Sequence, residues 1–206
     1  TSICFTKDNY DPISNIPIPT GTYSNKSLDI SYPKTIKENI IRLSKYKYLV
    51  SFKGQTNTPE RKKMYELLQH IPEYLIISNG RQYGGTNTTG TIPYYDLIYY
   101  SLFSLVPVGD GWISYRLMEV MATGSIPIII SDQWVLPFES FLNWKEFSII
   151  IKFEELERLP IIIKNNMVNY HDMSNKCFEI YHNFFKKGDA IMKGIEEHIK
   201  SVEISK

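Results

Sequence analysis

The segment at residues 107–112, Pro-Val-Gly-Asp-Gly-Trp, combines residue types that suit an anion-binding loop between a strand and a helix. Pro107 ends an apolar run, and Gly109 and Gly111 let the backbone come close to a ligand. The helix that follows directs its first amide donors and the positive end of its dipole back at this loop, with Ser114 in its first turn. The spacing therefore predicts that phosphate oxygens bind here.

Arg116 and Glu119 lie three residues apart and share one face of the helix predicted over residues 113–123. The opposite, core-facing stripe consists of Ile113, Leu117, Val120 and Met121. A guanidinium near a helix N-terminus suits two oxygens of a diphosphate, and a carboxylate one turn later suits the hydroxyls of a ribose. The alternative is a surface salt bridge between the two side chains, which the spacing alone favours.

A second cationic turn follows the apolar run at residues 48–52, where Lys53 and Gly54 begin a loop. The Thr-Pro-Glu triplet at residues 58–60 has the residue types that start a helix, and Arg61 then lies in the first helical turn. Cations at two strand-to-helix turns strengthen the prediction of a phosphate site. The alternative for Arg61 is a solvated side chain on an amphipathic helix.

The third segment that could contact a ligand, residues 131–138, follows the most hydrophobic run of the chain. Asp132 and Gln133 carry polar groups that suit a sugar or a nucleobase. Trp134 and Trp144 carry rings that stack on such ligands, although packing in the core is the alternative, and the favoured one for Trp144. We therefore include Asp132 in the predicted ligand site.

Alternating elements must position these segments. Short apolar strands are predicted at residues 48–52, 74–77, 103–106 and 126–130, and one more apolar run lies at residues 147–151. Helices are predicted from residue 34, with Ile36, Ile40, Ile41 and Leu43 on one side, and at residues 59–68, 93–102, 113–123, 138–142, 159–166, 169–185 and 191–201. The alternation predicts an α/β fold, a Rossmann-like parallel sheet flanked by helices, which binds ligands outside the carboxyl ends of its strands.

The first part of the chain differs from the rest. Four prolines and a glycine lie between residues 10 and 33, with no sustained helical period. We expect residues 1–45 to be a loop-rich lead-in that wraps a domain formed by residues 46–206. The length of 206 residues fits one large α/β domain or a domain and a half.

Composition narrows the class of protein. Hydrophobic residues make up 43% of the chain and charged residues 22%, which is typical of a globular protein and not of a disordered one. The net charge of +1 gives no general attraction to nucleic acid or to an anionic membrane, and no apolar run is long enough to span a bilayer. The 15 tyrosines suit sugar or base ligands and equally suit core packing.

Motifs for several other chemistries are absent from the sequence. It contains no Gly-x-Gly-x-x-Gly, no Gly-Lys-Ser, no His-Glu-x-x-His and no Gly-x-Ser-x-Gly. Cys4 and Cys177 do not have zinc-ligand spacing, and three of the four histidines fall in the predicted C-terminal helices. There is also no Asp-x-Asp, so we predict neither a metal nor a cofactor. Arginines, lysines and helix dipoles would meet the charge of a diphosphate.

Several short elements, taken in order, closely resemble the exostosin family, which is glycosyltransferase family 47. They are FSLVPVG at residues 103–109, SYRLMEV at 114–120, GSIPII at 124–129, Asp132, LPF at 136–138 and NWKEF at 143–147. Upstream elements of the family are matched by FKG at 52–54 with Arg61, by Tyr95 with Ser101, and by DISYP at 29–33. The number and order of these elements make the resemblance specific over roughly residues 29–165.

The resemblance implies the nucleotide-sugar-binding half of a GT-B glycosyltransferase that inverts the anomeric carbon and has no obligatory metal. It implies that Arg61 and Arg116 meet the donor diphosphate, that Glu119 meets the ribose, and that residues 1–45 are a remnant of the acceptor-side domain. The partners are then a nucleotide-sugar, favoured as a UDP-sugar, and a glycan or glycoprotein acceptor. The rest of the predicted donor-binding set is Lys53, Gly54, Pro107, Gly109, Ser114 and Asp132.

Inverting transfer needs a base for the acceptor hydroxyl and a stabilised diphosphate leaving group. Asp110 is the carboxylate nearest the predicted site and is the catalytic candidate, although the family's usual place for a base is the acceptor domain, supplied by a partner chain or by a missing N-terminal domain. Two other classes stay open: a non-catalytic nucleotide-sugar-binding module or fragment, and an α/β anion-binding regulator. The resemblance implies the Golgi or ER lumen for a eukaryotic protein and the cytoplasm for a viral or bacterial one.

Overall fold

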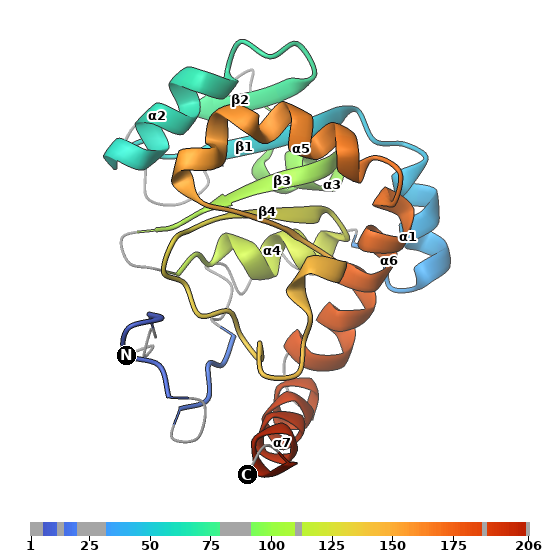
Figure 1. Ribbon diagram of the computed structural model, residues 1–206. Helices are drawn as coiled ribbons and strands as arrows, with labels where there is room; N and C mark the ends of the chain where they lie inside the picture. The colour runs from blue at the N-terminus through green and yellow to red at the C-terminus, as the bar shows by residue number, and fades with distance from the viewer. Residues whose placement is uncertain are drawn as a thin grey trace.

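One parallel sheet organises the chain. The structure is a computed structural model, and it describes residues 6–11, 15–19, 32–78, 92–109, 113–186 and 189–204. Within these residues five strands pair in the order β2-β1-β3-β4-β5 (Figure 1). Their bounds are β1 Tyr48–Gly54, β2 Tyr74–Ser78, β3 Ser101–Pro107, β4 Ile126–Ile130 and β5 Ile149–Ile151. Every pairing is parallel, which confirms the predicted Rossmann-like α/β arrangement.

The central strand β3 and its neighbour β4 are mostly apolar. Every residue of β3 and of β4 is buried. In their register Phe103 lies opposite Ile126, and Leu105 lies opposite Ile128. A parallel strand covered on both faces needs apolar side chains on both, which explains why these segments show no alternation of apolar and polar residues.

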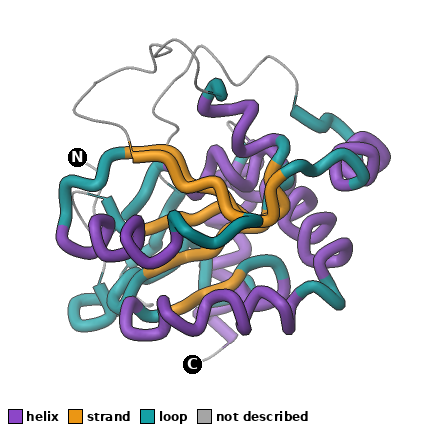
Figure 2. Tube along the Cα trace, turned by 90° about the horizontal axis from the view of Figure 1, so that it is seen from above, coloured by secondary structure: helices purple, strands orange, loops and turns teal. Residues whose placement is uncertain are grey.

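Helices cover both faces of this sheet (Figures 1 and 2). The α-helices are α1 Ile36–Leu43, α2 Pro59–Leu68, α3 Tyr94–Tyr99, α4 Arg116–Thr123, α5 Leu159–Asn166, α6 Tyr170–Ile180 and α7 Asp189–Ile204. Short 3₁₀ segments occupy η1 Trp144–Glu146 and η2 Phe153–Arg158, and a π-helical turn, η3 Tyr181–Phe185, continues α6. Helices α2 and α5 pack on one face and α4 on the other, so the core has two parts. None of the described helices has the length and apolar character needed to cross a bilayer.

Local signals set several boundaries as predicted. Helix α2 begins after Thr58, whose hydroxyl accepts a hydrogen bond from the backbone N–H of Arg61 at 3.2 Å. Helix α4 ends at Gly124, which has a left-handed φ of 75°. The predicted helix over residues 93–102 is too long, because the chain leaves α3 after Tyr99 and enters β3 at Ser101.

The predicted helix over residues 138–142 is wrong. The segment forms turns around Phe138, which has a φ of 57° that does not fit a right-handed helix. The Phe138 ring is fully buried against Phe141 and Phe185, and its N–H donates to the carbonyl of Pro17 at 3.1 Å. Packing between distant segments therefore overrides the local preference for a helix.

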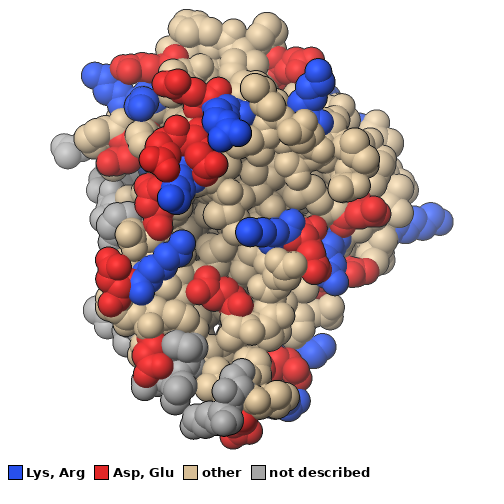
Figure 3. Space-filling view, viewed as in Figure 1, with Lys and Arg blue, Asp and Glu red and all other residues tan. Residues whose placement is uncertain are grey.

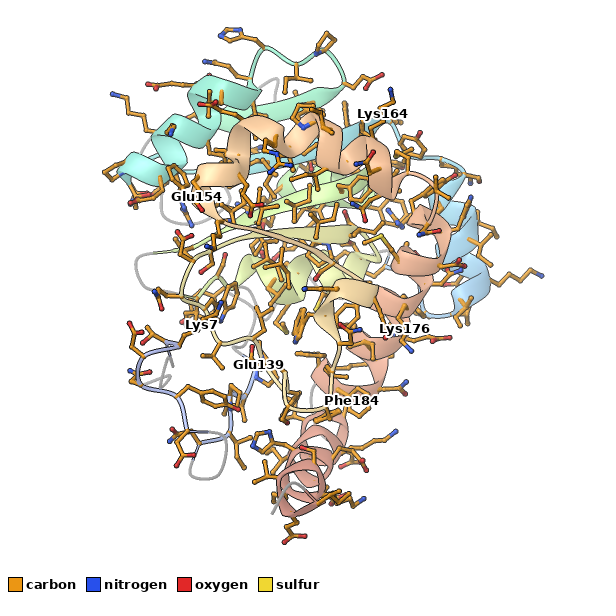
Figure 4. The ribbon with its side chains drawn as sticks, viewed as in Figure 1. Lys7, Glu139, Glu154, Lys164, Lys176 and Phe184 are labelled. Atoms are coloured by element: carbon orange, nitrogen blue, oxygen red, sulfur yellow. The ribbon has the colours of Figure 1, made fainter. Side chains whose placement is uncertain are left out.

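The described parts of the N-terminal segment lie against the turns that follow β4. Thr6 forms an antiparallel bridge with Trp134, and the N–H of Lys7 donates to the carbonyl of Gln133 at 3.2 Å. Figure 4 shows Lys7 and Glu139 on the same side of the sheet. Burial raises the pKa of the Glu139 carboxyl, while a backbone hydrogen bond from Leu136 and the nearby charge of Lys7 act in the opposite direction.

Candidate functional site

The carboxyl ends of β1 and β3 meet at the point where the direction of chain progression across the sheet reverses. From β1 the chain moves outward to β2, and then crosses back to β3 on the other side of β1. Because the loops after β1 and β3 leave the sheet in opposite directions, a crevice opens between them in folds of this kind. The described predicted residues at this edge are Lys53 and Gly54 at the end of β1, Arg61 in the first turn of α2, Gly109 and Ser114 between β3 and α4, and Arg116 at the start of α4.

Arg116, the first residue of α4, is held between two aromatic rings. Its guanidinium carbon lies 4.6 Å from the centroid of Phe52 and 4.9 Å from that of Tyr94. Its Nη2 donates to the carbonyl of Lys53 at 2.5 Å, which ties the helix to the end of β1. Stacking fixes the plane of the guanidinium, and within the described residues its Nε and Nη1 have no hydrogen-bond partner. The cation is therefore oriented and keeps donors for a ligand.

Glu119 lies on the same helix and is buried. Its carboxylate accepts hydrogen bonds from the hydroxyl of Tyr94 at 2.5 Å and from the hydroxyl of Tyr95 at 3.4 Å. The ion pairs that the described residues form do not include one between Glu119 and Arg116. The alternative that spacing alone favoured, a surface salt bridge between Arg116 and Glu119, is therefore not observed. The Glu119 carboxylate instead accepts hydrogen bonds from Tyr94 and Tyr95.

Arg61 joins the two loops of the crevice. Its Nε donates to the carbonyl of Val108 after β3 at 2.9 Å, and its Nη1 approaches the carbonyl of Gln55 after β1 at 3.4 Å. These bonds place its guanidinium between the two strand ends. The alternative of a solvated arginine on an amphipathic helix is excluded by the bond to Val108.

At each of the two glycines of the predicted set, an added Cβ would come within 3 Å of a neighbouring atom. A Cβ on Gly54 would lie 2.8 Å from Nη2 of Arg116, and a Cβ on Gly109 would lie 2.8 Å from the carbonyl oxygen of Ile113. The N–H of Gly109 donates to that same carbonyl at 3.0 Å, which closes the loop before α4. Each glycine therefore allows a close approach that shapes the crevice.

Other residues of the predicted set have structural contacts. Lys53 is buried, and its Nζ donates to the carbonyl of Ile92 at 2.7 Å. Pro107 is the buried last residue of β3, and Ser114 is buried at the turn before α4, where its carbonyl accepts from the N–H of Leu117 at 3.2 Å. These contacts hold the loops that carry the two arginines.

Three further predicted ligand contacts come after β4, the strand next to β3. Asp132 is exposed after β4, and no described hydrogen bond or ion pair joins it to Arg61 or Arg116. Trp134 and Trp144 are buried in the core, and Nε1 of Trp144 donates to the carbonyl of Pro137 at 3.0 Å. Core packing is therefore the observed role of both tryptophans. Asp110 lies outside the described residues.

The prediction missed the aromatic residues that hold the charged pair. Phe52 and Tyr94 stack on Arg116, and the ring of Tyr95 meets that of Tyr32 at 6.1 Å. The hydroxyl of Tyr32 is buried and has no hydrogen-bond partner in the described part of the chain. Burial first, and then the neighbouring Tyr95 and Glu119, raise its pKa. The elements that carry the family resemblance include Phe52, Tyr95 and Tyr32, whereas the high tyrosine content was the only sequence signal for Tyr94.

Charges of both signs are interspersed over the face that Figure 3 shows. This distribution agrees with the net charge of +1. Among the described residues no group of three or more His, Cys, Asp or Glu side chains could hold a metal ion. The predicted site's cations at the carboxyl edge are Lys53 in β1, Arg61 in α2 and Arg116 in α4.

Comparison with known proteins decides the family. The family model of the Exostosin GT47 domain matches residues 2–167. The chain belongs to the exostosin GT47 family. It is 23% identical over 173 residues to "Exostosin-1 homolog" of Caenorhabditis elegans, covering 76% of this chain and 45% of the relative. It is 28% identical over 147 residues to "Exostosin-1" of Drosophila melanogaster, covering 64% of this chain and 19% of the relative.

Plant relatives match over a shorter segment. A "Probable glucuronosyltransferase" of Oryza sativa subsp. japonica is 39% identical over 70 residues, which cover 34% of this chain and 17% of the relative. This exostosin GT47 chain thus spans less than half the length of each of these curated relatives.

Proposed function

We propose that this chain is the nucleotide-sugar-binding half of a GT-B glycosyltransferase, and that it binds the diphosphate of the donor with Arg116 and Arg61. The observation that carries the proposal is the state of Arg116. It is oriented by Phe52 and Tyr94 at the crevice between β1 and β3, and it retains donors that no described residue uses. A planar guanidinium with free donors is suited to bind two oxygens of a diphosphate.

The proposed reaction transfers a sugar with inversion to a glycan or glycoprotein acceptor. The acceptor hydroxyl oxygen attacks the anomeric carbon, the bond from that carbon to the diphosphate oxygen breaks, and the nucleoside diphosphate leaves with the electron pair. Arg116 and Arg61 stabilise the charge that develops on the leaving group. A base must take the acceptor's proton, and Asp110 is the residue we propose to test for this role.

The donor is proposed to be a UDP-sugar. Glu119 is proposed to accept hydrogen bonds from the ribose hydroxyls, since its carboxylate lies one helical turn from Arg116 and has acceptor positions beyond those that Tyr94 and Tyr95 fill. Because relatives in rice are named as glucuronosyltransferases, UDP-glucuronic acid belongs among the donors to be tested.

Binding of nucleoside diphosphates tests the proposal directly. UDP, GDP and ADP are titrated by calorimetry with and without EDTA, and at least one of them should bind with an affinity that chelation does not change. Arg116→Ala should weaken that binding by about 1.5–3 kcal/mol, the range for hydrogen bonds to charged groups, with little change in melting temperature. Arg158→Ala is the matched control, because Arg158 is an exposed arginine on η2.

Two outcomes would contradict the proposal. One is the absence of binding by all three nucleotides, and the other is equal binding by the Arg116→Ala and control proteins. A transfer assay with UDP-sugars and glycan acceptors then separates the two remaining classes. An enzyme releases UDP in the presence of acceptor, whereas a non-catalytic nucleotide-sugar-binding module binds the donor without turnover.

A further inference from the structure

Tyr94 contacts both of the charged side chains that we propose to bind the donor. Its ring lies 4.9 Å from the guanidinium carbon of Arg116, and its hydroxyl donates to Oε2 of Glu119 at 2.5 Å. No other described residue both stacks on this arginine and donates to this carboxylate. The second donor to Glu119, the hydroxyl of Tyr95, is at 3.4 Å and forms a weaker bond.

The chemistry of Tyr94 suits this double contact. Burial raises its pKa well above the ordinary value; the charge of Arg116 opposes this rise, and the charge and hydrogen bond of Glu119 add to it. The hydroxyl therefore stays protonated and donates at neutral pH. The face of its ring carries the negative part of the aromatic quadrupole, which attracts the cation above it. One side chain therefore offers a proton to the anion and an electron-rich face to the cation.

The geometry separates the charges that would otherwise pair. Arg116 and Glu119 are spaced to form an ion pair on the helix surface, and such a pair would consume the donors and acceptors that a ligand needs. Tyr94 stacks on the Arg116 guanidinium and donates one hydrogen bond to the Glu119 carboxylate, and it leaves both charges unpaired by an ion of opposite sign in the described part of the chain. Within the described residues Arg116 keeps Nε and Nη1 for a ligand, and Glu119 keeps acceptor positions.

We propose that Tyr94 is a positioning residue that couples Arg116 to Glu119, with its ring orienting the group that binds the diphosphate and its hydroxyl orienting the group that binds the ribose. The inference rests on the proposed function. It predicts that the two parts of the Tyr94 side chain control two different parts of the ligand.

The experiment removes these parts one at a time. The first ligand is whichever of UDP, GDP and ADP binds most tightly, and the second is its 2′-deoxy analogue. Calorimetry measures the affinity of each ligand for the whole chain and for its variants. The wild type should prefer the ribonucleotide by about tenfold, the value of one good hydrogen bond to a charged group. Tyr94→Phe, which keeps the ring, should reduce this preference to about twofold while changing the affinity for the deoxy analogue by less than about threefold.

Tyr94→Leu removes the ring as well and should weaken both ligands by about tenfold or more. Tyr99→Phe is the matched control, because Tyr99 ends the same helix and its hydroxyl has no contact with either charged group. Thermal melting checks that each variant is folded. A purely structural role would lower stability and weaken both ligands equally, without changing the preference for the ribonucleotide.

The results separate the failure of this inference from that of the proposed function. If the wild type binds with the expected preference and Tyr94→Phe retains it, Tyr94 does not position Glu119 and the inference is wrong. Equal binding of both ligands by the wild type would also overturn it, because Glu119 would then not contact the ribose. If the wild type binds none of the nucleotides, the proposed function itself fails.

Discussion

Two arginines at opposite edges of the sheet have opposite surroundings. Arg42 of α1 is fully buried at the amino edge, where it bonds to the carbonyls of Ser101, the first residue of β3, and of Gly124, two residues before β4. Arg116 lies at the carboxyl edge, where it is partly exposed, stacked between two rings and hydrogen-bonded through Nη2 alone among the described residues. One arginine therefore stabilises the fold at the amino edge, and the other keeps hydrogen-bond donors for a ligand at the carboxyl edge.

All five N–H groups of Arg42 are satisfied. Its Nε donates to Asn39, its Nη1 to the carbonyls of Tyr99 and Ser101, and its Nη2 to the carbonyl of Gly124 and the hydroxyl of Ser174, at 2.6–3.2 Å. Carbonyls at the C-terminal ends of α3 and α4 carry the negative ends of the helix dipoles, so they stabilise a cation without a carboxylate. Burial lowers the pKa of Arg42 to about 10, which leaves it charged at neutral pH.

The two edges are connected through α4. The helix begins at Arg116 on the carboxyl edge and ends at Gly124, whose carbonyl binds Arg42 on the amino edge. A Cβ on Gly124 would lie 2.1 Å from Oδ1 of Asn39, so the packing there requires glycine as well as a positive φ. Arg42 therefore fixes one end of the helix whose other end presents the ligand-facing groups.

The largest expected effect is the loss of stability in Arg42→Met, which removes the hydrogen bonds that Arg42 donates at the amino edge of the sheet. It removes a donor from the carbonyls of Tyr99, Ser101 and Gly124, of which only Gly124 keeps a second described side-chain donor, the hydroxyl of Ser174. Each buried group left unsatisfied costs about 1–3 kcal/mol, so the free energy of unfolding should fall by at least about 2 kcal/mol. Urea denaturation measures this loss. Arg158→Met is the control and should change stability by less than about 0.5 kcal/mol. If Arg42→Met lowers the free energy of unfolding by less than about 1 kcal/mol, other donors replace Arg42. The contrast between a structural Arg42 and a ligand-facing Arg116 would then be wrong.

An intermediate effect, on binding and not on stability, is expected from Gly54→Ala at the carboxyl edge. The new methyl group would lie 2.8 Å from Nη2 of Arg116, which is the end of a flexible side chain and can move away. The displaced guanidinium should bind a nucleoside diphosphate about tenfold more weakly, while the urea midpoint stays nearly unchanged. Calorimetry and urea denaturation together check this. If Gly54→Ala loses stability but binds the nucleotide as the wild type does, Gly54 has a structural role only.

The smallest effect concerns pH and His182, in the π-helical turn that continues α6. Burial lowers its pKa, and its Nδ1 lies 3.0 Å from the carbonyl of Phe178, which it meets as a donor in the neutral ring. Because the folded pKa is below the unfolded one, stability is complete above the unfolded value of about 6.5 and falls as the pH drops toward the folded pKa.

Unfolding free energies at pH 7.5 and pH 5.5 measure that dependence. His182→Gln should lose less stability between these two values than the wild type does. Nucleotide binding by the folded protein should show no difference between them that depends on His182, because the described contacts of this side chain are with Phe178 and Tyr181 and do not include Arg116. An identical pH dependence in both proteins would show that His182 does not contribute.

The sequence predicted the sheet and the loops of the site because their signals are local. Apolar runs identify β1, β3 and β4, the Thr-Pro-Glu pattern starts α2, and the glycine after α4 ends that helix. Alternation of strands and helices then places Arg61 and Arg116 after neighbouring strands, at the carboxyl edge where ligands bind. Both arginines follow from short-range patterns and from the rules for parallel sheets.

Tertiary structure decided which face of α1 is buried and what surrounds the charged groups. Ile36, Ile40 and Ile41 are exposed, while Asn39 and Arg42 are buried against α3, α4 and α6. Hydrophobicity alone favours the reverse, but the buried carbonyls of Ser101 and Gly124 need donors, which Arg42 supplies. In the same way, the contacts of Tyr94 with Arg116 and Glu119 join residues from different helices. Their spacing in the sequence does not encode them, because only the packing of α3 on α4 brings their side chains together.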